Sequence, residues 1–204
     1  MLMKRYLLLK INQNCGKIMK NLLKKVKVMM SKNKPLFNTV LSALFLGIAL
    51  VLPFLTGQVP QIGKSLCPMH IPVMLCGFFC GPWYAAAVGL IAPFLRFALF
   101  GMPAVVPDGV VMCAELAAYG ITAALLYRAL PQKKIFVYVS LIGSMIAGRI
   151  VWGGMRTLLY GLGKAPFGFS VFITVGFINA LPGIVLQLIL IPIIVMPLKK
   201  YTKC

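Results

Sequence analysis

From Leu36 onward the chain is a succession of apolar runs separated by short turns that are polar or contain proline and glycine. A transmembrane helix needs about 20 mostly apolar residues, because it rises about 1.5 Å per residue through hydrocarbon about 30 Å thick. The runs cover about 36–56, 68–80, 83–100, 107–127, 135–160 and 167–196. They predict an all-α membrane protein with six transmembrane helices, in one membrane domain over 35–204. Within it, we expect Pro72 to break the second helix, and Pro182 and Pro192 to kink the sixth.

Composition excludes an ordinary soluble domain and argues against nucleic-acid binding. Hydrophobic residues make up 61% of the chain and charged residues 11%, whereas a soluble domain has about 25% charged residues. The 21 Lys and Arg against two acids would indicate nucleic acid in a soluble protein. Here the basic residues gather before the first apolar run and at the ends of later ones, so the lipid bilayer is the expected partner.

The distribution of loop charge predicts the topology. The segment before Pro35, the turn at 128–134 and the C-terminus are basic, whereas the three other turns carry only Lys64 and Lys164. Basic loops stay in the cytoplasm, so an even number of spans with both termini cytoplasmic is favoured. The expected location is a bacterial plasma membrane, crossed several times.

Residues 1–34 form a basic N-terminal segment that holds ten of the basic residues. Its longest leucine run, at 7–9, is too short for the apolar core of a secretory signal. Three interpretations stay open: an amphipathic helix on anionic lipid, a disordered basic tail, or a stretch added by an upstream start codon. We assign it no function beyond a cytoplasmic position.

Ionisable residues inside the apolar runs are the candidates for function, because charge in hydrocarbon is costly and usually faces the bundle interior or water. In the predicted topology, five helices each place such a polar group in the outer half of the membrane. Residues 149, 152, 153, 156 and 160 follow helical spacing on one face, as do 108, 115, 119 and 122. These faces predict a cavity open to the outside. The predicted substrate-binding set is Arg149, Arg156, Trp152, Glu115, Arg96, Asn179, Tyr119, His70 and Tyr160.

Other interpretations of the same residues stay open. Arg96 and Arg156 are near enough to the outer surface to snorkel to the interface. Glu115 is expected to pair with Arg96 or Arg156, which would equally serve to hold the bundle together. Against this, three arginines face only Glu115 and Asp108, which leaves surplus positive charge. A guanidinium fork suits a carboxylate or phosphate, so we predict a small anion with an apolar portion.

Catalysis and resident cofactors are not expected. One histidine and two acids do not assemble a general acid–base pair or a metal site, and the cysteines are expected to be buried small hydrophobes. We therefore predict no enzyme activity, no catalytic residue, no metal and no cofactor.

A set of short strings in order gives a family resemblance. The chain carries 69–73 (MHIPV), 89–96 (GLIAPFLR), 100–103 (FGMP), 115–120 (ELAAYG), 147–152 (AGRIVW) and 179–183 (NALPG). In this order and in a chain of this size, it resembles the substrate-binding S components of energy-coupling factor (ECF) vitamin transporters, from about residue 36 onward. The resemblance implies capture of a water-soluble vitamin from outside, and transport with a transmembrane T component and two cytoplasmic ATPases. The chain itself has no Walker A motif.

The resemblance also implies a docking motif and a range of ligands. S components dock the T component through a small-xxx-small motif in the first helix, which Ala43 and Gly47 match, although packing within the chain explains that spacing equally well. Pantothenate is the first expectation for the ligand, with niacin, folate, biotin and lipoate open. The alternative function is a self-sufficient secondary transporter of a small organic anion, which usually shows inverted repeats; the sequence has none by eye.

Overall fold

All the regular structure in the computed structural model is helical. It describes residues 34–55, 67–101, 104–131, 133–162 and 172–202, so the basic N-terminal segment lies outside the described residues. The helices are α2 (Lys34–Leu55), α4 (His70–Phe79), α5 (Pro82–Phe100), α6 (Val110–Ala129), α7 (Lys134–Leu162) and α9 (Leu181–Thr202). Two short segments precede α6 and α9: η1 (Val105–Gly109), which is kinked by the extended backbone of Val106, and η2 (Thr174–Ile178), a π-helical turn. The predicted all-α class is confirmed.

Five of the helical segments are long and apolar enough to cross a bilayer: α2, α5, α6 with η1, α7, and the stretch from η2 through α9. The sixth, α4, has ten residues and a length of about 15 Å, which is too short to cross alone. Nine of its ten residues are buried, so α4 is a core helix enclosed by the longer ones. The six predicted segments are therefore present, with the second one inside the bundle.

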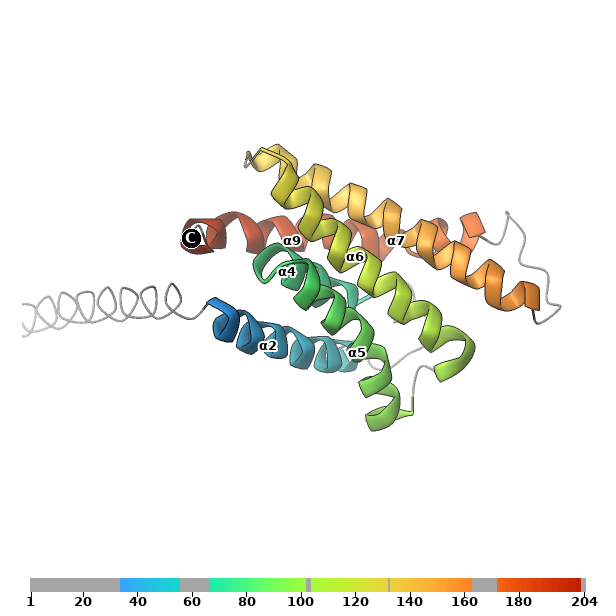
Figure 1. Ribbon diagram of the computed structural model, residues 1–204. Coiled ribbons are helices and arrows are strands. Elements are labelled where there is room, and N and C mark those ends of the chain that lie inside the picture. The colour runs from blue at the N-terminus through green and yellow to red at the C-terminus, as the bar shows by residue number, and fades with distance from the viewer. Residues whose placement is uncertain (1–33, 56–66, 102–103, 132, 163–171, 203–204) are drawn as a thin grey trace, which may run out of the picture.

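Helix α6 is the centre of the packing, with α4, α5 and α7 against it (Figure 1). Glycines allow two of these contacts. A Cβ added to Gly77 of α4 would lie 2.6 Å from the carbonyl oxygen of Gly120, and one added to Gly89 of α5 would lie 2.7 Å from the backbone nitrogen of Ala117. Small residues let helices approach closely in membranes, where packing rather than water exclusion drives association. The approach of α4 to α6 brings the start of α4 near the polar residues of α6.

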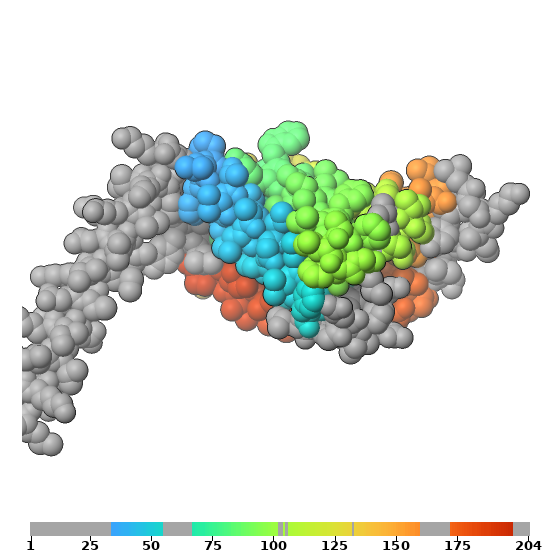
Figure 2. Space-filling view, turned by 90° about the horizontal axis from the view of Figure 1, so that it is seen from below, coloured from blue at the N-terminus to red at the C-terminus, as the bar shows by residue number. Residues whose placement is uncertain are grey.

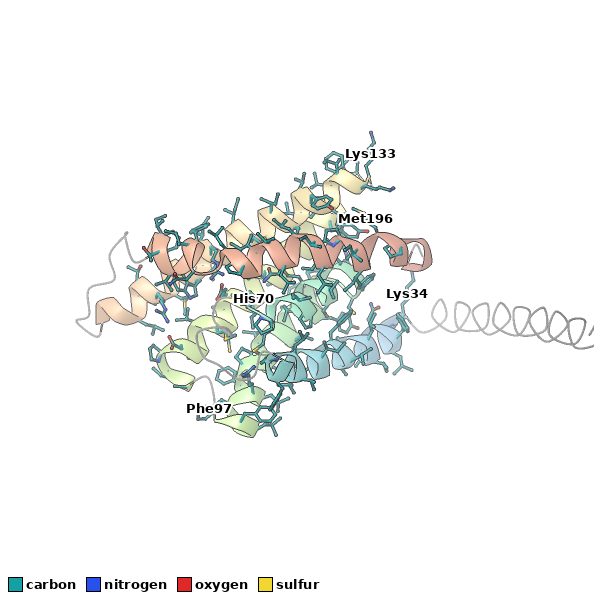
Figure 3. All side chains as sticks on the ribbon, turned by 180° about the vertical axis from the view of Figure 1, so that it is seen from behind. Lys34, His70, Phe97, Lys133 and Met196 are labelled. Atoms are coloured by element: carbon teal, nitrogen blue, oxygen red, sulfur yellow. The ribbon has the colours of Figure 1, made fainter. Side chains whose placement is uncertain are left out.

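The ends of the helices sort as the charge pattern predicts. Lys34, Lys133 and Met196 lie at one end of the molecule, and Phe97 lies toward the other (Figure 3). The Tyr84 hydroxyl donates to the carbonyl oxygen of Pro35 over 3.3 Å, which ties the start of α2 to the start of α5. The end that carries Lys34 and Lys133 is the one that the positive-inside rule assigns to the cytoplasm.

Two expectations about prolines were wrong in detail. Pro72 does not break a helix, because it lies in the first turn of α4, where its missing N–H has no intrahelical partner to lose. The sixth segment is interrupted before Pro182 rather than kinked at it. The Asn179 N–H donates to the Thr174 carbonyl oxygen over 2.9 Å to close η2, a turn follows, and α9 begins at Leu181. Pro192 lies within a continuous α9.

Candidate functional site

A buried ion pair with a third polar partner lies where α4, α6 and α7 meet. Arg149 Nη1 of α7 donates to Glu115 Oε1 of α6 over 3.0 Å. His70 Nε2, at the first residue of α4, lies 3.3 Å from the same oxygen. The exposed fractions are 3% for His70 and Glu115 and 7% for Arg149. We call His70, Glu115 and Arg149 the deep cluster, which three helices distant in sequence bring together.

The deep cluster is held by close packing as well as by charge. The Tyr119 ring meets the His70 ring edge-on, with centroids 4.9 Å apart and an interplanar angle of 84°. Tyr119 in turn lies directly on the backbone of α7 at Gly148, where an added Cβ would collide with the ring. Gly148 is therefore the residue that lets Tyr119 reach the deep cluster.

Cys67, which precedes α4, also contacts the deep cluster. Arg149 Nη2 donates to Cys67 Sγ over 3.7 Å. Burial raises the pKa of the Cys67 thiol, and the positive charge of Arg149 lowers it by less. The group beside the arginine is therefore a neutral thiol at neutral pH, and Glu115 supplies the compensating charge.

Besides His70 Nε2, which faces Glu115 Oε1 at 3.3 Å without forming a hydrogen bond, two polar atoms of the deep cluster have unused hydrogen-bonding capacity. His70 Nδ1 and Arg149 Nε are buried and have no hydrogen-bond partner among the described residues. A buried polar group left without a partner costs about 1–3 kcal/mol, so such atoms in a native protein usually meet water or a ligand. These two nitrogens are candidates for contact with a polar group of a bound molecule.

A second ion pair lies nearer the end of α7. Arg156 Nη2 donates to Asp108 Oδ1 of η1, and we call these two residues the shallow pair. The side chains are 20% exposed for Arg156 and 41% for Asp108. The start of α6 and the end of α7 lie at the same end of the molecule, away from α2's first residue (Figure 1). The shallow pair is thus more accessible than the deep cluster.

Trp152 connects the two ion pairs. Its ring lies 5.1 Å from Arg156 Cζ and 5.9 Å from Arg149 Cζ, so both guanidinium groups are within cation–π range. Its other neighbours come from the segment before α9: the Phe172 ring is 6.1 Å away, and Gly176 leaves room for the indole. The site therefore has an aromatic wall next to the two arginines.

The predicted surplus of positive charge is absent from this cluster. Glu115 pairs with Arg149, not with Arg96 or Arg156, and Arg156 pairs with Asp108. Within each pair the arginine and the carboxylate neutralise each other, so the two pairs hold equal numbers of cationic and anionic side chains.

The remaining predicted residues are placed differently. Arg96 is partly buried on α5 and belongs to neither ion pair. Asn179 ends η2 and is exposed. Tyr160 lies in α7, and its side chain is outside the described residues. The predicted set also missed three contributors, which are Asp108, Cys67 and Phe172. Asp108 could have been included because it is one of only two acids in the sequence. No sequence signal stood out for Cys67 or Phe172.

Ala43 and Gly47 of α2 face away from the rest of the described residues. Ala43 and Gly47 are exposed, and a Cβ added to Gly47 would meet nothing within 4 Å. Figure 2 shows α2 at the surface beside α5. Packing within the chain therefore does not account for the small-xxx-small spacing among the described residues.

Comparison with known proteins gives one match. A family model described as "ECF transporter, substrate-specific component" matches residues 36–195. No curated protein and no solved structure matches the chain. The matched residues include both ion pairs, Trp152 and the exposed face of α2.

Proposed function

Because the chain belongs to the family of substrate-specific components of ECF transporters, we propose that it captures a small carboxylate-bearing vitamin between α4, α6, α7 and the segment before α9. Pantothenate is the first ligand to test. In this proposal Arg156 and Trp152 bind the carboxylate end, and the deep cluster binds a polar group at the other end of the ligand.

The observation that carries the proposal is the partly exposed guanidinium of Arg156. Its Cζ lies 5.1 Å from the centroid of the Trp152 ring, and its Nη2 donates to the Asp108 carboxylate of η1. A guanidinium presents donors in a planar fork that matches a carboxylate, and Arg156 already donates from Nη2 to one carboxylate oxygen, Asp108 Oδ1. The aromatic wall suits the apolar carbons next to such a carboxylate.

The deep cluster supports a bipolar ligand rather than a simple anion. Arg149 is neutralised by Glu115, so it does not offer a second net positive charge. His70 Nδ1 and Arg149 Nε instead offer hydrogen bonds to a neutral polar group. Pantothenate carries a carboxylate at one end and an amide and hydroxyls toward the other. Niacin, folate, biotin and lipoate also carry carboxylates and belong in the same test.

The test compares ligand binding by the purified protein and by Arg156→Ala. Loss of a charged hydrogen bond costs about 1.5–3 kcal/mol, so we expect pantothenate to bind about 10–100-fold more weakly. Leu158→Ala is the matched control, because Leu158 is an exposed residue near the same end of α7 and belongs to neither ion pair. Equal affinity in Arg156→Ala and Leu158→Ala would show that Arg156 does not bind the carboxylate.

Transport is proposed to require a T component, which docks on the exposed face of α2, and two cytoplasmic ATPases. The support is the open space at Gly47 and the absence of a Walker A motif from the sequence. We expect Gly47→Leu to reduce co-purification with a co-expressed T component while ligand binding by the isolated chain is retained. Unchanged association would refute this docking face. Gradient-driven uptake by the chain alone in vesicles would instead indicate a secondary transporter.

A further inference from the structure

We propose that Asp108 is an internal competitor for the ligand's carboxylate: it occupies Arg156 in the ligand-free protein and is displaced when the ligand binds. This inference rests on the proposed function, because it assumes that Arg156 is the carboxylate-binding group. It goes further by assigning to Asp108, which is not itself a ligand-binding residue, the control of affinity and of selectivity between acids and neutral molecules.

The first argument is the accessibility of the pair. Asp108 is 41% exposed and lies in the five-residue turn η1, before α6 begins. Its carboxylate is solvated in part even while it holds Arg156, so exchanging Arg156 for water costs it little free energy. Partly exposed ion pairs contribute about 0–1 kcal/mol, which a ligand with additional contacts to Trp152 can exceed.

The second argument is charge balance. A ligand carboxylate that approaches Arg156 while Asp108 remains bound would place two negative charges on one guanidinium. Two like charges about 4 Å apart repel by about 1 kcal/mol in water and about 4 kcal/mol at the effective dielectric constant near a protein surface. The acid must therefore displace Asp108. A neutral analogue experiences no such repulsion, so Asp108 affects acids selectively.

The competing explanation is that Asp108 only orients Arg156 over Trp152. An orienting residue would help every ligand that contacts Arg156, whether acidic or neutral. The two roles therefore predict opposite signs for removal of the charge: a competitor's removal tightens acid binding, and an orienting residue's removal weakens it.

The experiment measures binding of matched acid and neutral probes to the full chain in detergent. The pairs are pantothenate with pantothenol, nicotinate with nicotinamide, and biotin with biotinamide. We expect Asp108→Asn to tighten binding of the acid by roughly three- to ten-fold, and to change binding of its neutral partner by less than about two-fold. Asp108→Glu restores the charge and should reverse the gain. When Asp108→Asn is added to Arg156→Ala, the affinity for the acid should not rise, because the arginine for which Asp108 and the ligand carboxylate compete has been removed.

Each outcome decides between the two proposals. If acids bind the wild type but Asp108→Asn leaves their affinity unchanged or lowers it, the competitor role is wrong and the proposed ligand class stands. If an acid binds only Asp108→Asn, the competitor role is supported strongly. If no acid binds either protein, the carboxylate ligand class is wrong, and the competitor role is refuted along with it.

Discussion

The two ion pairs on α7 use the same chemistry seven residues apart in surroundings that differ sharply. In the deep cluster, Arg149 and Glu115 have side chains at most 8% exposed, with His70 against the same carboxylate oxygen. In the shallow pair, Asp108 is 41% exposed. A sealed charge pair is hard to open, because either partner left alone in a low-dielectric interior is strongly destabilised. A half-open pair exchanges its partner for water or for another carboxylate at low cost.

The difference originates in the elements that carry the two acids. Glu115 lies within α6, the helix against which α4, α5 and α7 all pack, so its position is fixed by the whole bundle. Asp108 lies in η1, which contacts α5 and α6 at the end of the molecule. We infer that the deep cluster is chiefly a scaffold that positions Trp152 and the His70 nitrogens, and that the shallow pair is the part that exchanges with ligand.

The largest effect that distinguishes the two pairs is expected from Glu115→Gln. This change leaves the Arg149 guanidinium buried without its compensating charge, which typically costs about 3–5 kcal/mol. This loss of stability is measured by thermal unfolding of the purified protein in one detergent, with the folded fraction followed against temperature. The matched control is Asp108→Asn, which makes the same chemical change in the shallow pair and should cost less than about 1 kcal/mol. Equal destabilisation by the two variants would show that burial does not separate the pairs.

The sequence predicted the helical class, the apolar segments and the meeting of His70, Glu115, Arg149, Arg156 and Trp152. Periods of helical spacing and the cost of charge in hydrocarbon are local or additive properties, so they can be read from one chain. The pairing of the charges was predicted wrongly, because Glu115 was expected to pair with Arg96 or Arg156 and instead pairs with Arg149. Which arginine reaches which acid depends on how closely the helices approach, and that distance is set by contacts such as Gly77 on Gly120 that no periodicity reveals.

The same limit explains the residues that were missed. Asp108 looked like the terminal residue of a span, whereas η1 turns it toward α7. Phe172 lies in the sixth apolar run among other phenylalanines, so the sequence does not single it out, and its role emerges only because Gly153 leaves space for its ring on α7. Residues that act through a turn or through a neighbour's missing side chain carry little signal in the sequence.

A smaller effect, which sharpens the comparison, is expected from two glycines of α7 that flank the two arginines. Gly148 precedes Arg149, and an added methyl group would collide with the Tyr119 ring, whereas Gly154 lies two residues before Arg156 with nothing within 4 Å of its added Cβ. Overpacking a tight contact costs about 1–3 kcal/mol, so Gly148→Ala should destabilise the protein by that amount. Gly154→Ala should stabilise it by about 0.5–1 kcal/mol, because alanine loses less backbone entropy in a helix. The same detergent unfolding experiment measures both variants.

Because Tyr119 cannot move without disturbing His70, Gly148→Ala should also weaken ligand binding while Gly154→Ala does not. Equal stability and equal ligand affinity in the two variants would show that the packing of Tyr119 on Gly148 is looser than the structure indicates.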